Sequence, residues 1–521
     1  LVAAVGVMSR AGGVRGVIDR LLRFARTARS GLLLTWGMGL LLFFDDYANC
    51  VLVGNTMRPL TDRLRISREK LAYVVDSTAA PVAGISLIST WIAFEVSVFS
   101  AQLPGVGITE SGYALFLRSL PFRYYCFFAL GFVLLTILTG RDFGPMARAE
   151  ERARRTGQLV RPGARPPVSD TLARMEPAPG MPLDWRVAVL PIAATLAVTV
   201  WRIFADGGGL ELLRTDASSL LTLEGITGVL LEGSGARPIF IGAAVALLLS
   251  VFLAGSATTR WAVSAGTVAA LAFAGAVEPT FARALGSNLA GYASFALLFT
   301  TVAGVAALAA SRLATRRPYL PWRELGRAGV SGAGTLGFAV VLLLEAWMIG
   351  RVCEDIGTAD YLVGLLSDAL PAELLPALLF GLACLVAFAT GSSWSTMSIL
   401  LPNVVALAAS LSSAAGTGAS LMVPLCIAAV LEGSIFGDHC SPISDTTVLS
   451  SVASGSDHLD HVRSQAPYAL AAAAAAVVFG YLPAARLAWW SFPLAMALGF
   501  GALWGALRLF GRTPEGAPTR G

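Results

Sequence analysis

The stretch Glu432-Gly-Ser-Ile-Phe-Gly-Asp-His-Cys-Ser-Pro-Ile-Ser-Asp-Thr-Thr447 interrupts what begins as a membrane-spanning helix. It follows the apolar run 419–431, yet a spanning helix normally stays apolar for about twenty residues. Here small and polar residues and Pro442 stand where the second half of that helix is expected. In lipid, such a break is stable only where it is buried in protein or lines a wet cavity. We therefore expect the functional site at this break.

The composition predicts an all-α polytopic membrane protein. Of the 521 residues, 55% are hydrophobic and only 14% are charged, whereas soluble domains carry about 25% charged residues. Unbroken apolar runs such as 285–311 differ from the alternating strands of a transmembrane β-barrel. The net charge of +5 comes mostly from arginines between the apolar runs. We interpret it as topological charge rather than as a nucleic-acid surface.

Two basic loops restrict the topology of the first apolar region. Residues 10–29 carry six arginines, and the second loop carries Arg58, Arg63, Arg65, Arg68 and Lys70. Basic loops tend to face the cytoplasm, so the segment between them cannot cross the membrane an odd number of times. A re-entrant hairpin with Asp45, Asp46 and Asn49 near its tip satisfies this rule. A plain helix is the alternative.

The apolar runs divide one membrane transport domain, residues 1–521, into four parts. Residues 1–139 form a first repeat half, 140–183 a polar cytoplasmic loop, 184–311 connecting and scaffold helices, and 312–521 a second repeat half. Spans are expected near 186–204, 237–255, 261–277, 285–311, 466–482 and 485–508, among others. Because the chain opens on Leu1 within an apolar stretch, we expect the start of a preceding helix to be missing.

Both repeat halves show the same order of breaks, which predicts an inverted repeat. A re-entrant hairpin with a polar tip comes first, at 45–56 and again at 391–396. A broken transmembrane helix with an acid before a proline follows, in Asp76-Ser-Thr-Ala-Ala-Pro81 and in Asp438-His-Cys-Ser-Pro442. The first hairpin enters from inside and the second from outside. In such architectures the substrate site lies near the bilayer midplane, between the broken helices.

Ionisable groups and oxygen ligands gather at these breaks. A charged side chain in the bilayer costs roughly a few kcal/mol or more, so it is normally paired or faces a cavity. The candidate ion- and proton-binding residues are Asp45, Asp46, Asn49, Asn55, Thr56, Asp76, Ser77, Thr78, Ser392, Ser393, Ser395, Thr396, Glu432, Asp438, His439, Ser441, Ser444, Asp445 and Thr446, with Glu345 as a coupling residue. We place sodium at Asp76, Asp438 and the oxygens around them.

A carboxylate at such a site lets a proton and a cation compete for one group. Burial favours the protonated form of a carboxyl group, and a bound cation favours the ionised form. This competition is the minimum chemistry of antiport. Adjacent acids such as Asp45 and Asp46 would titrate as a coupled pair.

Several of these side chains also have an ordinary structural interpretation. Glu345 and Glu432 can pair with an arginine or with the backbone, and His439 can be a packed neutral imidazole. We expect Glu95 at the membrane interface, and we expect His458 and His461 in a solvated loop. Three scattered histidines argue against a zinc site. The serine and aspartate clusters lack a paired histidine base, which argues against hydrolase chemistry.

Three motifs resemble signatures of the NhaC-type sodium/proton antiporters. They are Phe44-Asp-Asp-Tyr-Ala-Asn49, Ser67-Arg-Glu-Lys-Leu-Ala-Tyr-Val-Val-Asp-Ser-Thr-Ala-Ala-Pro81 and Phe436-Gly-Asp-His-Cys-Ser-Pro-Ile-Ser-Asp-Thr-Thr447, and Gly391-Ser-Ser-Trp-Ser-Thr396 fits the same family. The resemblance implies a multi-pass protein of the prokaryotic inner (cytoplasmic) membrane. It implies inverted repeats, re-entrant hairpins and elevator-like alternating access, as in the wider ion transporter superfamily.

The resemblance also implies the activity and the partners. Sodium, or lithium, would be exchanged for protons, with membrane lipid as the surroundings, no nucleic acid and no cofactor beyond the transported Na+ and H+. Dimerisation is common in that superfamily, and we expect a homodimer on the basis of this resemblance alone.

Rival functions belong to other classes. One is sodium- or proton-coupled exchange of a small organic anion or amino acid, in which Arg351 or His439 would face a substrate carboxylate. Another is a passive channel. A third is a membrane enzyme using the loop 140–183, but that loop lacks a catalytic constellation, so we expect no enzyme.

Overall fold

The computed structural model describes residues 2–21, 25–43, 45–87, 89–166, 177–215, 236–255, 319–334, 371–415, 419–487 and 490–513, and the single positions 220, 229, 348, 352, 355 and 356. Glu345, Arg351 and the predicted spans 261–277 and 285–311 lie outside these residues. Within them the chain is helical, with two isolated bridges and no strand. The predicted all-α class is thereby confirmed.

The chain divides into two compact units, each described here by itself. Unit 1 comprises Leu1–Arg20 and Ala173–Gly337, and unit 2 comprises Leu21–Leu172 and Phe338–Gly521. Unit 1 contains α1 (Val2–Arg10), α11 (Arg186–Asp206), α12 (Gly209–Thr215), α14 (Ala236–Ala254) and α18 (Trp322–Gly334); α2 (Gly13–Leu21) lies at its boundary. In unit 1, α11 packs on α14, and α1 packs on both α14 and α18.

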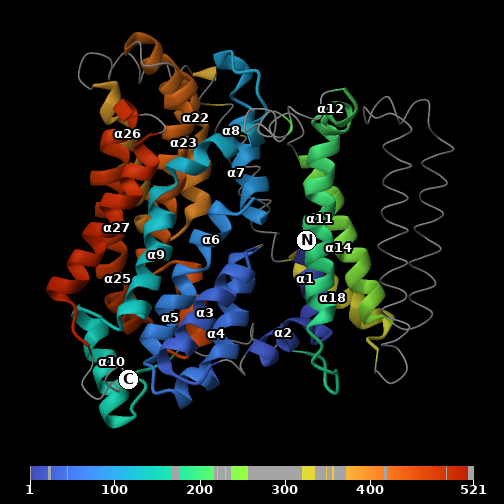
Figure 1. The fold of residues 1–521 in the computed structure, drawn as a ribbon, viewed down its shortest axis with the longest axis vertical. Coiled ribbons are helices and arrows are strands. Elements are labelled where there is room, and N and C mark those ends of the chain that lie inside the picture. Colours follow the sequence, from blue (N-terminus) through green and yellow to red (C-terminus); the bar gives the residue numbers. More distant parts are fainter. Residues whose placement is uncertain are drawn as a thin grey trace. The chain divides into compact units, whose positions relative to one another are not determined.

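Unit 2 holds all the broken helices predicted from the sequence (Figure 1). Its first part contains α3 (Ala28–Leu41), α4 (Asp46–Arg63), α5 (Arg68–Ser77), α6 (Ala80–Ile85), α7 (Thr90–Ser100), α8 (Gly112–Ser119), α9 (Tyr124–Thr139) and α10 (Gly144–Thr156). Its second part contains α21 (Leu375–Thr390), α22 (Ser393–Ala415), α23 (Ala419–Cys440), α24 (Asp445–Ser454), α25 (His458–Ala475), the π-helical η8 (Ala476–Tyr481), α26 (Leu482–Leu487) and α27 (Ser491–Phe510).

Four breaks interrupt these helices where the sequence places polar residues. They lie between α3 and α4, between α5 and α6, between α21 and α22, and between α23 and α24. Helix α24 packs on α4 and α5, and α23 packs on α21, α22 and α6. Helices from the two ends of the sequence therefore meet around the breaks. The inverted relation between the two sets of helices stays a prediction.

The break that opens at Glu432 is shorter than the polar stretch around it. Helix α23 continues through Asp438 to Cys440, and the chain leaves the helix only at Ser441. Pro442 explains this end, because proline disfavours helical backbone in the residue before it and has no N–H to donate. Ser444 then caps α24, since its hydroxyl accepts a hydrogen bond from the N–H of Thr447.

The break after α23 touches the break after α21. Gly391 ends α21 in the left-handed region, with φ +68°, and a Cβ there would lie 2.6 Å from Cγ1 of Ile443. The hydroxyl of Ser441 donates to the carbonyl of Phe388 at 2.9 Å. Carbonyls in the last turn of a helix lack a donor within that helix. The carbonyl near the end of α21 thus accepts its hydrogen bond from a residue of the other break.

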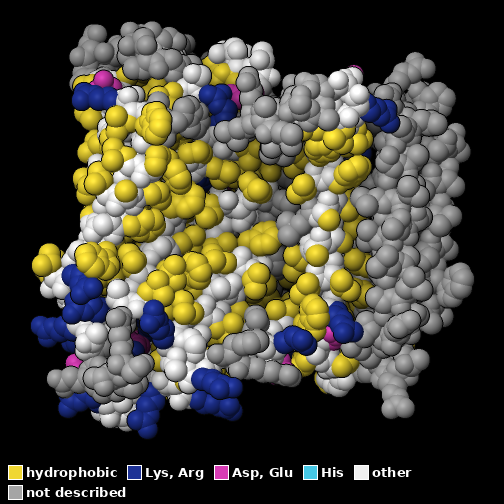
Figure 2. Space-filling model, in the orientation of Figure 1, with side chains coloured by type: hydrophobic (Ala, Val, Ile, Leu, Met, Phe, Trp, Pro, Cys, Tyr) yellow, Lys and Arg dark blue, Asp and Glu magenta, His cyan; other side chains and the backbone are white. Residues whose placement is uncertain are grey.

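Six helical segments of the described chain are long and apolar enough to cross a membrane, or seven if the bent pair Gly112–Phe122 and Tyr124–Thr139 is one span. The segments His458–Leu487 and Ser491–Phe510 replace the predicted spans 466–482 and 485–508. On the face drawn in Figure 2, hydrophobic side chains cover the middle of unit 2, and Lys and Arg gather mainly at the end that carries α10. The chain is a multi-pass membrane protein.

Part of the predicted loop 140–183 is a packed helix. Helix α10 packs on α5 and α25. Nζ of Lys70 donates to Oδ1 of Asp142 at 2.6 Å, and Oε1 of Glu150 accepts from both the N–H and the hydroxyl of Ser67 at 2.8 Å. These contacts hold α10 against the first turn of α5.

Candidate functional site

The carboxylate of Asp438 is surrounded by hydroxyl groups. Asp438 is 1% exposed and lies in the last turn of α23, where the negative end of the helix dipole disfavours an anion. The hydroxyl of Ser444 donates to Oδ1 at 2.6 Å, and those of Ser393 and Thr446 donate to Oδ2 at 3.3 Å. The starts of two helices, α22 and α24, thus supply the hydroxyls that hold this carboxylate in place.

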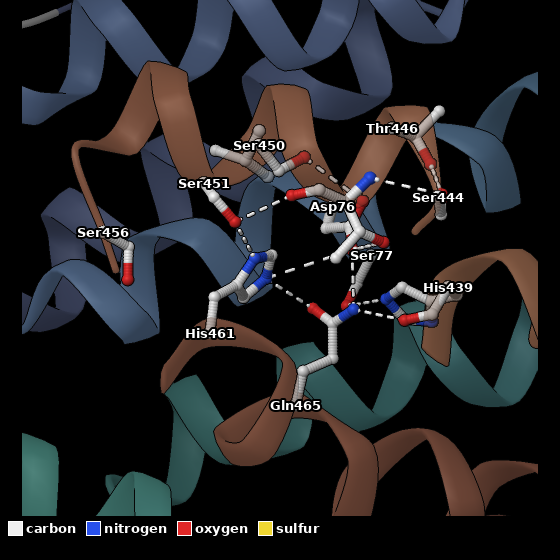
Figure 3. Close-up of polar contacts among 12 residues, drawn as sticks. Asp76, Ser77, His439, Ser444, Thr446, Ser450, Ser451, Ser456, His461 and Gln465 are labelled. Carbon is white, nitrogen blue, oxygen red and sulfur yellow. Dashed lines mark hydrogen bonds and ion pairs between the residues drawn. The ribbon is translucent and has the colours of Figure 1, made fainter. Parts of the chain in front are cut away.

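Asp76 occupies the corresponding position at the end of α5. It is 2% exposed, and its Oδ2 accepts from Oγ1 of Thr447 at 3.1 Å and from Nε2 of Gln465 at 2.6 Å (Figure 3). The hydroxyl of Ser450 donates to Oδ1 at 3.2 Å. Because Thr447 also lies 3.3 Å from the carbonyl of Asp438, one residue of α24 connects the two acids.

Asp46 differs from both of these acids. It is 1% exposed, and within the described part of the chain neither carboxylate oxygen has a hydrogen bond of ordinary geometry. The indole N–H of Trp91 lies close to this carboxylate, but it does not reach the distance and angle of an ordinary hydrogen bond. Asp45, Asp438 and Asp445 act on it electrostatically. Among the described residues, no Lys or Arg pairs with Asp46, Asp76 or Asp438.

Asn49 and Tyr47 connect the α3–α4 break to its neighbours. Nδ2 of Asn49 donates to the carbonyls of Gly39 at 2.7 Å and Thr78 at 2.8 Å, whereas its buried Oδ1 has no hydrogen bond in the described part of the chain. The hydroxyl of Tyr47 donates to the exposed Asp445. Asn49 therefore ties the first two breaks together and leaves one amide oxygen for a further ligand.

His439 lies behind Asp438 and is fully engaged. Its Nε2 is 3.0 Å from the hydroxyl of Ser77, and its Nδ1 is 2.7 Å from the hydroxyl of Tyr125. Thr78 donates its hydroxyl to the carbonyl of Val74 at 2.8 Å. Ser77 and His439 thus stand at the site, and the hydroxyl of Thr78 serves its own helix.

Other predicted residues lie in these helices but serve the backbone. Nδ2 of Asn55 donates to the carbonyl of Val51 at 2.9 Å, and Thr56 beside it is half-buried. Oγ of Ser392 accepts from the N–H of Ser395 at 3.3 Å, and Oγ1 of Thr396 donates to the Ser392 carbonyl at 2.9 Å. These contacts are those of helix starts and interiors.

Glu432 belongs to a separate buried ion-pair cluster. Its Oε2 accepts from the N–H of Cys126 at 2.6 Å, and its Oε1 lies 3.4 Å from Nη1 of Arg123. Nη2 of Arg123 is 2.5 Å from Oε2 of Glu95, and all three charged side chains have no exposed surface. Glu432 therefore has the arginine partner that was its structural alternative. Glu95, which we expected at the membrane interface, is buried within the protein against Arg123.

Sequence reasoning missed the contribution of α25. His461 has no exposed surface, so its predicted place in a solvated loop is wrong. Its Nε2 is 2.9 Å from Oε1 of Gln465 and 3.9 Å from Oδ2 of Asp76. His461 and Gln465 are four residues apart and share one helix face with Tyr468. Polar residues at helical spacing were the feature of the sequence that could have predicted this buried helix face.

Comparisons with known proteins identify the family of this chain. The model of the Na+/H+ antiporter family matches residues 82–483. A protein of Haemophilus influenzae without an assigned function is 28% identical over 455 residues, which is 87% of this chain and 71% of that protein. An arginine/ornithine antiporter of Halobacterium salinarum is 35% identical over 148 residues, 28% of either chain.

A malate-2H+/Na+-lactate antiporter of Bacillus subtilis is 39% identical over 79 residues, 15% of either chain. No solved structure matches. The family model covers most of the chain, including the breaks at 391–396 and 441–444, and the predicted resemblance is confirmed. The chain belongs to the Na+/H+ antiporter family and is a secondary antiporter.

Proposed function

We propose that the chain exchanges sodium, or lithium, for protons across the cytoplasmic membrane of a prokaryote by alternating access. The observation that carries this proposal is the carboxylate of Asp46, buried without a hydrogen bond of ordinary geometry in the described part of the chain. An ionised carboxylate there needs a neutralising charge, because burying an isolated charge is very costly. Either a proton or a cation supplies it.

Asp76 and Asp438 complete the proposed site through their oxygen-rich surroundings. Both carboxylates already accept hydroxyl hydrogen bonds, from Thr447 and Ser450 and from Ser444, Ser393 and Thr446. When a sodium ion arrives, these hydroxyls can turn their lone pairs toward it, since a hydroxyl is donor and acceptor alike. Proton and sodium then exclude each other, and this exclusion couples their movements.

Exchange of an organic substrate is the second candidate. Its support comes from the relatives, two of which are named for arginine and ornithine or for malate and lactate. The described acids suit the ammonium or guanidinium group of a cationic amino acid better than the carboxylate of an organic acid. The homodimer and the inverted repeat stay predictions under either function.

Purified protein in liposomes with a trapped pH dye tests the proposal. Starting from an acidic lumen, addition of sodium or lithium outside should alkalinise the lumen, and choline should not. Malate, lactate, arginine and ornithine are added separately at constant sodium. A response that requires one of the organic compounds, with none to sodium or lithium alone, would overturn sodium/proton exchange in favour of the second candidate.

A further inference from the structure

Two histidines share the hydroxyl of one buried serine on α24. Oγ of Ser451 lies 3.0 Å from Nδ1 of His458 and 2.8 Å from Nδ1 of His461. His458 is half-buried at the first position of α25, whereas Ser451 and His461 have no exposed surface. Figure 3 shows Ser451 facing the ring of His461, whose other side faces Gln465 and Asp76. The three side chains run from the edge of the protein toward the buried acid.

The second ring nitrogen of each histidine must carry a hydrogen. Nε2 of His458 is 2.6 Å from the carbonyl oxygen of Pro442, which can only accept. Nε2 of Gln465 donates to Oδ2 of Asp76 at 2.6 Å and to the carbonyl of His439 at 2.5 Å. This fixes the amide, so its Oε1 is the acceptor that lies 2.9 Å from Nε2 of His461. Both Nε2 atoms are therefore donors.

This arrangement is satisfied only when the pair holds one extra proton. With both imidazoles neutral, both Nδ1 atoms are acceptors, yet Ser451 has a single hydrogen to donate. The carbonyl of Thr447, at 2.8 Å, competes for the same hydrogen. If one histidine is an imidazolium, its Nδ1–H donates to Oγ of Ser451, whose own hydrogen goes to the other Nδ1. Every nitrogen then has a partner.

We propose that His458, Ser451 and His461 form a relay that carries this proton to the side of Asp76. As the N–H bond at Nδ1 of His458 breaks, Oγ of Ser451 takes that proton. The original O–H bond of Ser451 breaks in the same step, and its proton forms an N–H bond at Nδ1 of His461. The serine is regenerated, and one positive charge has moved from His458 to His461. No oxidant or further reactant is required.

The relay deepens the proposed function and rests on it. His461 ends the relay 3.9 Å from Oδ2 of Asp76, an acid of the proposed site. In the forward direction the relay supplies a proton beside this carboxylate, and in the reverse direction it returns the proton to His458, at the edge of the protein.

The charged groups around the relay are of both signs. Asp76 on α5 favours the imidazolium at His461, and His439 on α23 opposes it when charged. At the start of α25, Arg161 pairs with Asp457 and Asp460. Arg58 of α4 and Arg68 of α5 lie beside Gly455. Asp142 pairs with Lys70 and accepts from Tyr468, and Glu150 pairs with Arg154. Burial alone would raise the pKa of Asp457, but the N–H groups of Arg165 and Asp460 and the charge of Arg161 outweigh it and lower that pKa. Asp457 is therefore ionised next to His458 at neutral pH.

Ser451→Ala tests the relay in the full-length protein in liposomes. Removing the hydroxyl should slow sodium-driven proton movement by about tenfold or more, as expected when a proton-transfer group is lost. Exchange of radioactive sodium for unlabelled sodium moves no net proton and should stay within about twofold of wild type. Ser451→Thr keeps the hydroxyl and should restore proton movement. Ser454→Ala is the matched control, because it removes a buried hydroxyl of α24 that has no hydrogen bond in the described part of the chain.

The outcomes separate the relay from the function on which it rests. If wild type moves no protons in response to sodium, the proposed function and the relay both fail. If wild type responds and Ser451→Ala matches it across the pH range, the relay alone is overturned. Should Ser451→Ala fail to reach the membrane, His458→Gln at the half-buried end takes its place. Wild-type proton movement in that variant would equally overturn the relay.

Discussion

At the scale of single residues, two of the buried charged sites in the described part of the chain contrast with each other. The cluster of Glu95, Arg123 and Glu432 is paired internally, with N···O distances of 2.5 and 3.4 Å. Asp46 has no such partner among the described residues. Paired buried charges are costly to break, whereas an unpaired buried charge is costly to keep. The two kinds therefore predict opposite responses to substitution.

Neutralising Asp46 should remove exchange without destabilising the fold. In Asp46→Asn the amide carries no charge, so we expect an equal or higher midpoint of thermal unfolding. Sodium-driven proton movement should fall by about tenfold or more, because a charged ligand of the cation is lost. Asp19→Asn, at an exposed position, is the control and should change neither quantity. Wild-type exchange by Asp46→Asn would place the cation elsewhere.

Removing Arg123 should have the opposite effect. Arg123→Met leaves Glu95 and Glu432 buried without their cation, which costs about 3–5 kcal/mol of folding free energy. Denaturant unfolding in detergent, or the amount of folded protein recovered from membranes, measures this loss. Arg155→Met removes a side chain that is 61% exposed and pairs with Glu151, and it should cost about 0–1 kcal/mol. Equal stability of the two variants would contradict the assigned role of the cluster.

At the scale of elements, the position of Asp438 depends on the close approach of α23 to α21. A Cβ on Gly437 would lie 2.6 Å from the carbonyl oxygen of Cys384 and 2.4 Å from Cβ of Ala387. A Cβ on Gly433 would lie 2.4 Å from the carbonyl oxygen of Phe380. Small residues permit such backbone approach between helices in membranes. They place the last turn of α23 against the break at Gly391.

Gly437→Ala should push α23 away from α21 and displace Asp438 beside it. Overpacking of this kind costs about 1–3 kcal/mol, and we expect the sodium concentration for half-maximal exchange to rise as well. Gly381→Ala is the matched control in α21, because a Cβ there meets no atom within 4 Å. It should be neutral, or stabilising by up to about 1 kcal/mol from helix propensity. Identical behaviour of the two variants would show that the approach of α21 does not set the site.

At the scale of the whole molecule, the described unit 2 has two chemically different ends. Figure 1 places α10 at one end and α26 at the other, and Figure 2 shows Lys and Arg mainly at the α10 end. Basic segments stay on the cytoplasmic side during insertion. The α10 end is therefore expected to face the cytoplasm.

Cysteine labelling in cells checks this orientation. The cysteines of the described residues are all buried, and Cys353 is replaced by serine. In Arg155→Cys, on α10, the introduced thiol should react with a membrane-impermeant maleimide only after the cells are opened. In Arg486→Cys, where the native side chain is 72% exposed, it should react in intact cells. Labelling of both positions from the same side would contradict the topology.

The sequence by itself determined the class of the protein, its family and the positions of its breaks. Apolar length, arginine-rich loops and polar interruptions are local properties, so they can be read without a fold. The acids Asp46, Asp76 and Asp438 were found this way because a polar group within an apolar run stands out wherever the run lies.

Only the tertiary structure decided which of these groups are paired and which have no counterion among the described residues. Glu432 pairs with Arg123, although 309 residues separate them in the sequence. Asp76 accepts a hydrogen bond from Gln465, which is 389 residues away in the sequence. His461 is buried rather than solvated, because α25 packs on α5 and α23. A side chain's spacing in the sequence says nothing of such partners. They depend on how helices distant in the chain pack, and packing decides whether a buried charge meets a counterion, a hydroxyl or a passing ion.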